Sequence, residues 1–385
     1  MKKTEQGGLP LPDDGPSHRF AISPRYTLGV EIEFQTLDMK SWDLAPMAPI
    51  LLQNAPSLLR PRLSPEFIQS ILEIRTGVCF SLHDVENDLM QTISLAEELA
   101  VDNGCRLFSA SLHPFASHSD QLLTTNKRYA QIMDQLQIVG RRFIAQGLHV
   151  HVGMPDGDTA VRVNNKIQAY LPILLSLSTS SPFSQSEDTG LMSYRTKLFE
   201  ALPLAGIYTY LAGWADLVRE LDLLKAAGVI NSFKDLWWDA RPNPEFGTVE
   251  IRICDLPFRF NDILAITALI QALAATLAEQ REPAAPLDHY ILQANKWQAA
   301  RYGLDGEFLD PSGWLGGRRM SFRSAVVALL RTVIPMTVRL GSERYAGLVE
   351  PILSNGTGAD YMRKKFTETG NLKEVIRSLQ GEFWK

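Results

Sequence analysis

Cysteine is scarce in this sequence, with three in 385 residues. Cys79, Cys105 and Cys254 are far apart and form no Cys-x-x-Cys spacing, so the sequence supports neither a disulfide framework nor a thiolate zinc site. This pattern is typical of a reducing compartment, and we expect a cytoplasmic protein.

The sequence also lacks basic blocks and long apolar runs, which argues against nucleic acid and membranes as partners. The formal net charge is -5, and no block of Lys or Arg is long enough to bind nucleic acid or an acidic membrane surface by charge. No apolar run approaches a membrane span, and the first residues turn to Gly, Pro and Asp where a signal peptide needs an apolar stretch. We therefore expect a soluble protein with small-molecule partners, no nucleic acid and no membrane.

What is present is an ordinary globular composition, 45% apolar and 21% charged, which can bury a large core. Length alone would allow two domains, but the sequence has no internal repeat and no low-complexity linker. We expect residues 1–24 to be a flexible N-terminal tail and residues 25–385 to be a single domain that holds any active site.

The segment 26–38, YTLGVEIEFQTLD, places two carboxylates inside an apolar run. Side chains of a strand alternate between its two faces, so Glu31 and Glu33 share one face. The opposite face carries Leu28, Val30, Ile32 and Phe34. Repulsion between carboxylates on one face raises the cost of ionising both, so solvent or a cation must lie beside them.

Three more segments repeat this design of an apolar face opposite a polar one. The polar residues are Glu73 and Arg75 in ILEIRTGVCF, His149 and His151 in GLHVHVG, and Glu250 and Arg252 in GTVEIRICD. A solvated sheet face usually mixes Thr, Ser, Lys and Gln with Glu, so a shared cavity explains these faces better than water does. For each segment taken alone, an exposed strand face or hydrogen-bonded sheet histidines remain the alternative.

Carboxylates with imidazoles suit Mg2+ or Mn2+, whereas zinc prefers Cys and His, and the sequence has no HExxH helix. Mg2+ usually keeps substrate phosphates among its ligands, which indicates a nucleotide. Because the sequence has no GxxxxGK loop, we expect any ATP to be held by metal ions and arginines.

Amphipathic periodicity predicts the helices that connect these strands. They are expected at 81–104, 126–146, 159–178, 262–280, 288–303 and 323–340. Ser81 and Asp84 have the spacing of an N-cap and its partner, and Gly104 would end that helix. Half-buried alternating strands with long helical connections favour an antiparallel or mixed sheet in an α+β domain.

Four segments in combination resemble a known family: LGVEIEF, GLHVHVG, DLWWDARPNPEFGTVEIRICD and NKWQAARYGLDG. They are similar to the glutamate–cysteine ligase type 2 family, the YbdK-type bacterial carboxylate–amine ligases, which share the glutamine synthetase fold. The resemblance runs from residue 26 to about residue 310 and keeps the order of segments. It implies a curved, mainly antiparallel sheet with helices packed on one face, as in glutamine synthetase and guanidino kinases.

The resemblance implies an ATP-dependent carbon–nitrogen ligase of glutamate–cysteine ligase type. ATP would phosphorylate the side-chain carboxylate of glutamate or a similar acid, and an amine such as cysteine would displace phosphate to form an amide, with Mg2+ or Mn2+ bound. A metal-dependent phosphoryl transferase of guanidino-kinase type and a noncatalytic metabolite-binding protein are the alternatives. A homodimer would be unsurprising.

The resemblance also implies roles for individual residues. The implied metal ligands are Glu31, Glu33, Glu73, His149 and Glu250, with His151 near the ATP phosphates. Arg241 and Arg252 resemble the catalytic arginines, and Arg195 and Arg301 resemble contacts to the nucleotide or the substrate carboxylate.

The residues alone leave plainer interpretations open for several of these arginines. Arg195 and Arg301 are equally compatible with surface ion pairs, and Arg241 with an ordinary turn. Arg75 has no counterpart in the resemblance and is compatible with simply neutralising Glu73. The Gly-rich segment 312–319 is compatible with either a lid or an ordinary surface loop.

Overall fold

The four predicted strands become neighbours in one open sheet of a computed structural model, which describes residues 19–385. Every pairing in the sheet is antiparallel. The order is β2-β3-β1-β5-β9-β8, and β4 pairs with β1. The strands are β1 (Leu28–Asp38), β2 (Leu63–Pro65), β3 (Ile71–Arg75), β4 (Cys105–Phe108), β5 (Leu148–Gly153), β8 (Ala240–Asn243) and β9 (Thr248–Ile251).

Helices account for most of the remaining elements, so the expected α+β class is confirmed. The α-helices are α1 (Ala48–Asn54), α2 (Leu82–Asp102), α3 (Lys127–Leu136), α4 (Ile138–Arg141), α5 (Gly157–Ile167), α6 (Leu171–Ser178), α7 (Arg195–Glu200), α8 (Trp214–Ala226), α9 (Phe260–Glu279), α10 (His289–Tyr302), α11 (Phe322–Leu340), α12 (Glu343–Ala346), α13 (Val349–Asn355), α14 (Gly358–Thr369) and α15 (Leu372–Gln380). Short 3-10 helices are η2 (Arg60–Arg62), η3 (His118–Asp120), η4 (Phe233–Asp235) and η5 (Gly303–Asp305), and two small hairpins pair β6 (Phe183–Ser184) with β7 (Glu187–Asp188) and β10 (Glu307–Leu309) with β11 (Arg319–Ser321).

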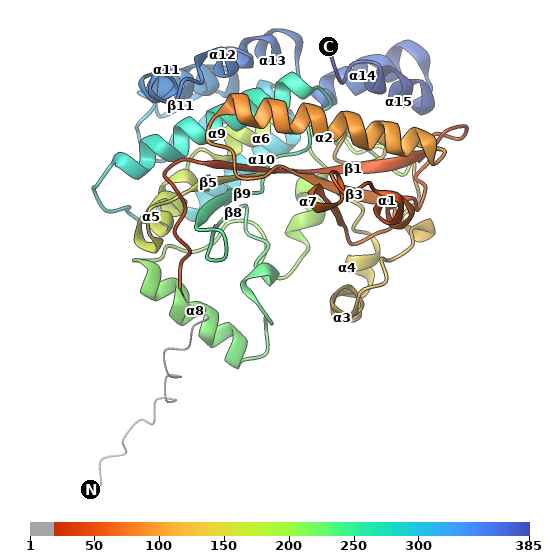
Figure 1. The fold of residues 1–385 in the computed structure, drawn as a ribbon. Coiled ribbons are helices and arrows are strands. Elements are labelled where there is room, and N and C mark those ends of the chain that lie inside the picture. Colours follow the sequence, from red (N-terminus) through yellow and green to blue (C-terminus); the bar gives the residue numbers. More distant parts are fainter. Residues whose placement is uncertain (1–18) are drawn as a thin grey trace, which may run out of the picture.

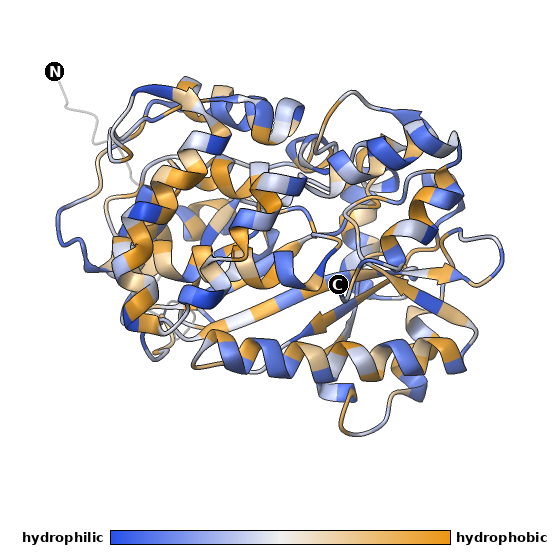
Figure 2. Ribbon diagram, turned by 90° about the horizontal axis from the view of Figure 1, so that it is seen from above, coloured by the Kyte–Doolittle hydropathy of each residue, from blue (hydrophilic) through white to orange (hydrophobic). Residues whose placement is uncertain are grey.

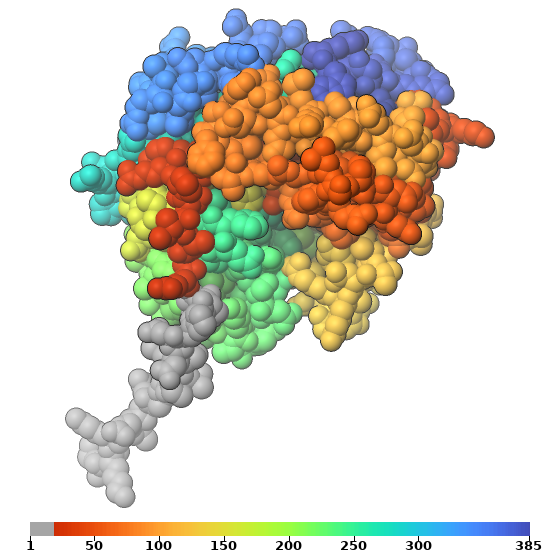
Figure 3. Space-filling model, in the orientation of Figure 1, coloured from red at the N-terminus to blue at the C-terminus, as the bar shows by residue number. Residues whose placement is uncertain are grey.

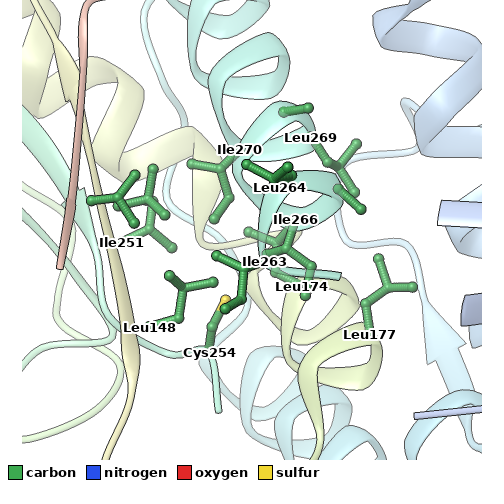
Figure 4. Packing of buried hydrophobic residues seen from close by; sticks show 14 of the residues in the cluster. Leu148, Leu174, Leu177, Ile251, Cys254, Ile263, Leu264, Ile266, Leu269 and Ile270 are labelled. Carbon is green, nitrogen blue, oxygen red and sulfur yellow. The ribbon is translucent and has the colours of Figure 1, made fainter. Parts of the chain in front are cut away.

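The apolar face of the sheet packs on α2 and α9, which lie along one side of it (Figure 1). The predicted apolar residues of β1 are at most 2% exposed. In Figure 4, Leu148 and Ile251 of the sheet lie opposite Ile263 and Ile270 of α9. Burying side chains of this size is worth about 1.5–3 kcal/mol each. The core is therefore built from the strand face opposite the carboxylates.

One helix, α9, is long and apolar enough to cross a membrane by length and composition. Its apolar window is 89% buried inside the molecule, as expected for a core helix. The long surface helices instead alternate apolar and polar residues along their length (Figure 2).

Local signals placed some element ends correctly and others wrongly. The capping box of α2 is confirmed, because Ser81 accepts from the Asp84 backbone and Asp84 accepts from the Ser81 backbone. The helix predicted over 126–146 is wrong as one element: α3 ends at Leu136, and the next residue, Gln137, has a φ of 49° that breaks the helical path before α4. The helix predicted over 159–178 likewise divides into α5 and α6, and Pro172 lies in the first turn of α6, where its missing N–H is tolerated.

The Pro-rich stretch expected as a loop around Arg241 forms strand β8. This strand ends the sheet order, and an edge strand tolerates Pro242, which has no N–H to donate. A strand fixes the direction of the Arg241 side chain more firmly than a turn does.

Residues 1–18 of the expected tail lie outside the described residues. Ala21, within the remainder, donates to the Pro244 carbonyl over 2.9 Å, and the Phe20 and Trp214 rings lie 5.2 Å apart.

Helices α3, α4 and α8 lie on the other side of the sheet from α9 (Figure 1). The space-filling view shows a hollow between the segment around residue 130 and the segment 200–240 (Figure 3). The polar face of the sheet forms the floor of this hollow.

Candidate active site

Strand register brings the predicted polar residues onto one face. Glu31 of β1 pairs with His149 of β5 on one side and with Arg75 of β3 on the other. Glu33 pairs with Glu73, and Glu250 pairs with both His151 and Arg241. Nearest neighbours across antiparallel strands have Cβ atoms about 4.5–5.5 Å apart, so these side chains must interact.

These residues line a single cavity of about 290 Å³. It contains eight of the ten residues singled out by the sequence resemblance, namely Glu31, Glu33, Glu73, His149, His151, Arg241, Glu250 and Arg252. The shared cavity inferred from four separate strand faces is therefore present among the described residues.

The first group of ligands in this cavity consists of Glu33, Glu66 and Glu73, whose carboxylate oxygens lie within 4.8 Å of one another. Burial and the charge of Glu33 raise the pKa of Glu66 to about 8. Burial and the charge of Glu31 raise the pKa of Glu73 well above its ordinary value. Within residues 19–385, no Lys or Arg forms an ion pair with any of the three carboxylates. Such a set fits a hard divalent cation.

A second group consists of Glu31, His151 and Glu250, again within 4.8 Å. His151 Nδ1 lies 3.0 Å from the Thr248 hydroxyl, which leaves Nε2 directed at Glu31 over 3.4 Å. Burial lowers the pKa of His151, but the charges of Glu250 and Glu31 outweigh it and the net shift is upward. Nε2 is buried, and its contact with Glu31 does not have hydrogen-bond geometry within the described part of the chain, so it can serve as a ligand atom when the ring is neutral.

Glu250 is held by two arginines. Arg241 donates to its carboxylate through Nε over 2.9 Å and through Nη2 over 3.1 Å, a bidentate pair, and Arg252 donates through Nη1. Although burial raises the pKa of Glu250, the charges of Arg241 and Arg252 lower it well below its ordinary value. Glu250 therefore stays ionised, whereas the raised pKa values of Glu66 and Glu73 favour their protonated forms.

Arg241 is largely committed to this structural role, because its Nη1 also donates to the Leu236 carbonyl over 2.8 Å. The guanidinium of Arg252 makes no other hydrogen bond among the residues described, so its Nε and Nη2 can donate to a ligand in the cavity.

His149 lies between the two groups. Its Nδ1 is 3.4 Å from Glu31 and 3.9 Å from Glu33, and its buried Nε2 has no hydrogen-bond partner in residues 19–385. Burial and the charge of Arg252 lower its pKa, so the ring is neutral and can act as a ligand. The second group, with Glu31 and Glu250, contains His151 and not His149. The sequence resemblance implied the reverse, with His149 as a metal ligand and His151 near the ATP phosphates.

Two predicted arginines do not line the main cavity. Arg195 is 2% exposed and donates to the carbonyls of Ile253 and Arg252, over 3.1 and 3.2 Å. Arg301 lies on α10 with its guanidinium over the Tyr302 ring. Arg75 does line the cavity, and its guanidinium contacts only the Pro61 carbonyl at 3.4–3.5 Å, without an ion pair within residues 19–385.

Sequence reasoning missed Glu66, which completes the first group. The structure explains its position by register: Ser64 pairs with Glu73, so Glu66, two residues further on, lies on the same face, and the sequence alone does not give this pairing. The short strand β2 was hidden in a Pro-rich stretch. Sequence reasoning also missed the buried Lys296, which pairs with Asp239 over 2.6 Å.

Comparisons with known proteins agree on one family. The sequence profile of glutamate–cysteine ligase family 2 matches residues 27–378. A Gloeobacter violaceus protein provisionally named glutamate–cysteine ligase 2 is 37% identical over 366 residues, which cover 94% of this chain and 98% of that one. A Solibacter usitatus protein with the same name is 36% identical and covers 92% and 93%.

Two solved structures are similar in fold. The glutamate–cysteine ligase of Francisella tularensis, determined in complex with AMP, has a TM-score of 0.66 at 14% identity and covers 94% of this chain and 90% of that one. A bifunctional glutathione synthetase from Pasteurella multocida has a TM-score of 0.68 at 15% identity and covers 93% and 52%.

Proposed function

The chain belongs to glutamate–cysteine ligase family 2, and from this premise we propose how its cavity joins a carboxylate to an amine. The chain is an ATP-dependent carbon–nitrogen ligase that acts on small molecules. Family membership favours this activity over the guanidino-kinase and noncatalytic alternatives. The names of the relatives support glutamate as the donor and cysteine as a candidate acceptor, and the three buried free thiols support a cytoplasmic location.

The observation that carries the proposal is the group Glu33, Glu66 and Glu73, three crowded carboxylates without a cationic partner in residues 19–385. This group would hold one Mg2+ or Mn2+, and the group with His151 would hold another, with His149 between them. A bound ion supplies positive charge against the phosphates of ATP.

The side chains then have distinct tasks. Arg252, which lines the cavity and whose Nε and Nη2 make no hydrogen bond within residues 19–385, would donate to the transferred phosphoryl group as negative charge builds up on it. Glu250 orients Arg252, and Arg241 in turn fixes Glu250 from the edge strand. Arg241 is therefore proposed as a positioning residue, while Arg252 touches the reacting atoms.

The reaction has two steps. A carboxylate oxygen of the donor attacks the terminal phosphorus of ATP, the bond to the bridging oxygen breaks, and ADP leaves. The amine nitrogen then attacks the carbonyl carbon of the acyl phosphate, the carbon–oxygen bond breaks, and inorganic phosphate leaves. The ammonium form of the acceptor must give up its protons to solvent or a base before and after this attack. The positioned arginine supplies charge stabilisation in both steps.

The test is ADP release by the purified chain with ATP and Mg2+ or Mn2+, across glutamate and related acids, with and without amines that include cysteine. We expect release that needs both an acid and an amine, together with an amide of the summed mass. Release of a phosphorylated acid without an amide, or ATP binding without ADP release, would contradict the ligase assignment.

A further inference from the structure

We propose that Lys296 is a positioning residue of the site, which acts through Asp239 to hold Arg252 where it contacts the transferred phosphoryl group. Lys296 lies on α10 and is not among the residues that line the main cavity, so it would act through its neighbours and not on a substrate. The inference rests on the proposed function, because that function gives Arg252 its task.

Lys296 is a buried lysine, and buried lysines almost always have a partner of opposite charge. The residue is 3% exposed, and its Nζ donates to both carboxylate oxygens of Asp239, over 2.6 and 2.9 Å. A carboxylate oxygen of Glu200 lies 3.3 Å from the same Nζ. The ammonium group therefore joins α10 to the last residue of α7 and to the segment just before β8.

Asp239 in turn supports the backbone of Arg252. The pairing of β8 with β9 ends at Ala240 and Ile251. Beyond this pair, the Asp239 carbonyl accepts from the N–H groups of both Arg252 and Ile253, over 2.9 and 3.1 Å. Two residues of one strand that oppose one residue of the other form a β-bulge, which turns a side chain in a new direction. The direction of the Arg252 side chain therefore depends on the position of Asp239.

The Asp239 side chain depends on Lys296 alone. Within residues 19–385, no other group donates to the Asp239 carboxylate, which belongs to a residue that is 8% exposed. Without Lys296 a largely buried charge would have no partner, so the segment would shift to bring the carboxylate to water. Because Arg252 is hydrogen-bonded to the same residue, its backbone would shift too.

The same lysine also ties together the two supports of Arg252. Asp239 holds the N–H of Arg252, whereas Arg195, the first residue of α7, donates to its carbonyl over 3.2 Å. Glu200, at the other end of α7, contacts Lys296. Lys296 therefore helps to set the spacing between the two segments that hold the Arg252 backbone. A displacement of about 1 Å in such a group can lower a rate about 100-fold.

A role in stability alone is the plainer interpretation of this ion pair. Buried ion pairs add little net stability, because the cost of removing both charges from water offsets their attraction. Kinetic constants separate the two roles, since a group that is placed wrongly lowers kcat in a protein that remains folded.

The first experiment compares Lys296→Met with Lys197→Met in steady-state kinetics with ATP, Mg2+ and the acid and amine of highest turnover. Lys197 is the matched control, because it pairs with the same Glu200 over 2.6 Å while Asp239 keeps Lys296. We expect Lys296→Met to lower kcat roughly 30-fold with little change in KM, and Lys197→Met to change neither. Equal kcat values in the two variants, or an effect confined to KM, would overturn the inference.

Asp239→Asn tests the link between the two residues, and it preserves the shape of the side chain if Lys296→Met does not fold. We expect Asp239→Asn to lower kcat about tenfold. The double variant should be no slower than Lys296→Met, because both changes remove the same contact. Losses that multiply in the double variant would mean that the two residues act separately, against the proposal.

Hydrogen exchange tests the positioning without turnover. The N–H groups of Arg252 and Ile253 should exchange about tenfold faster in Lys296→Met, relative to the N–H groups of β5. Asn295→Leu is the control for a general loss of stability, because Asn295 is buried on the same helix but bonds the backbone of Leu309. It should lower the melting temperature, leave kcat unchanged and alter exchange in both strands alike. The same uniform change in Lys296→Met would overturn the inference.

The exchange experiment also separates this inference from the proposed function. If no acid and amine pair releases ADP, the ligase assignment fails, and exchange at Arg252 and Ile253 still decides whether Lys296 holds their backbone. If ADP is released normally by Lys296→Met, the ligase assignment stands and the positioning role is refuted.

Discussion

At the scale of residues, carboxylates that share one sheet face have opposite pKa shifts. Burial raises the pKa of Glu31, but His151 and His149 outweigh it and hold the carboxylate ionised. Glu73, on the neighbouring strand, has no ion-pair partner within residues 19–385, and burial and the charge of Glu31 raise its pKa although the charge of Arg75 opposes the shift. The metal-free cavity therefore carries an electrostatic strain that a cation would relieve.

This strain predicts that Glu73→Gln stabilises the metal-free protein and abolishes its activity. When the pKa of a carboxyl is raised in the folded protein, the group does not affect stability below its unfolded pKa. As the pH rises above that value, ionisation favours the unfolded chain and the folded protein is destabilised. At neutral pH an uncharged Gln therefore removes this destabilisation. Loss of a metal ligand should lower turnover by about 100-fold or more. Thermal unfolding in EDTA and ADP release test the two effects.

The control for this variant is Glu350→Gln, which alters an exposed carboxylate on α13 and should change neither quantity. A lower melting temperature for Glu73→Gln in EDTA, or normal turnover, would contradict the account of the first carboxylate group.

A second prediction separates two arginines that look alike in sequence. Arg75 lines the cavity without an ion pair in residues 19–385, so we expect it to contact an anionic part of ATP or of the donor acid. Arg75→Gln should raise one of these KM values about tenfold with little effect on stability, because the side chain is exposed. Arg301→Gln should leave KM unchanged, since Arg301 lies over Tyr302 outside the cavity. Steady-state kinetics of both variants measure these KM values. A larger rise in KM for Arg301→Gln than for Arg75→Gln would assign the substrate contact to Arg301 instead.

At the scale of elements, local alternation was sufficient to predict the two faces of β1, β3, β5 and β9. It could not predict register, because which residues meet across strands depends on contacts between distant segments. Glu66 was missed for this reason. Helix breaks at Gln137 and before Pro172 were missed because amphipathic periodicity continues across a break.

Arg195, the first residue of α7, holds the backbone that follows β9 in place. No pattern in the sequence predicted this contact. Arg195 donates to the backbone carbonyls of Arg252 and Ile253, just after the end of β9. It packs so closely on Gly147 that a Cβ added there would lie 2.3 Å from Arg195 Nη2. Gly147 also donates its backbone N–H to Glu33 over 2.7 Å. Close packing of Arg195 on glycine therefore sets the position of both a predicted metal ligand and the proposed phosphoryl-contacting arginine.

From this contact we expect Arg195→Lys to lower kcat about tenfold with smaller changes in KM. Lysine keeps a positive charge near Asp255, but it cannot bridge two carbonyls with a planar fork, so the Arg252 backbone loses its support. Kinetics at saturating ATP and glutamate, with a melting curve to check folding, measure this. A change confined to KM would indicate a substrate contact instead.

At the scale of the whole molecule, stability and chemistry come from opposite faces of one sheet. The core lies between the sheet and α2 and α9, while the ionisable residues of the site lie on the other face. Changes in the cavity should therefore alter turnover more than they alter folding. The pH dependence of folding should include groups distant from the site.

His113 is such a group, and it joins two distant segments. It is 1% exposed, its Nε2 donates to the Trp42 carbonyl over 2.8 Å, and its Nδ1 accepts from the Ala116 N–H over 2.9 Å. The contact with Ala116 requires the neutral ring, because a protonated Nδ1 cannot accept a hydrogen bond. Burial lowers the pKa of His113 to about 4, although the charge of Asp43 opposes the shift.

The unfolded chain takes up this proton near pH 6.5, while the folded protein resists it until about pH 4. The stabilising effect of His113 is therefore complete above pH 6.5 and is lost as pH falls toward 4, by on the order of 3 kcal/mol. In His113→Asn this dependence should be absent, so its unfolding free energy should approach that of the unaltered chain as pH falls. Denaturant unfolding at several pH values in this range measures the difference between the two. A difference that stays constant with pH would mean that the ring is not held neutral, and that the contact between residues 42 and 113 does not contribute to acid sensitivity.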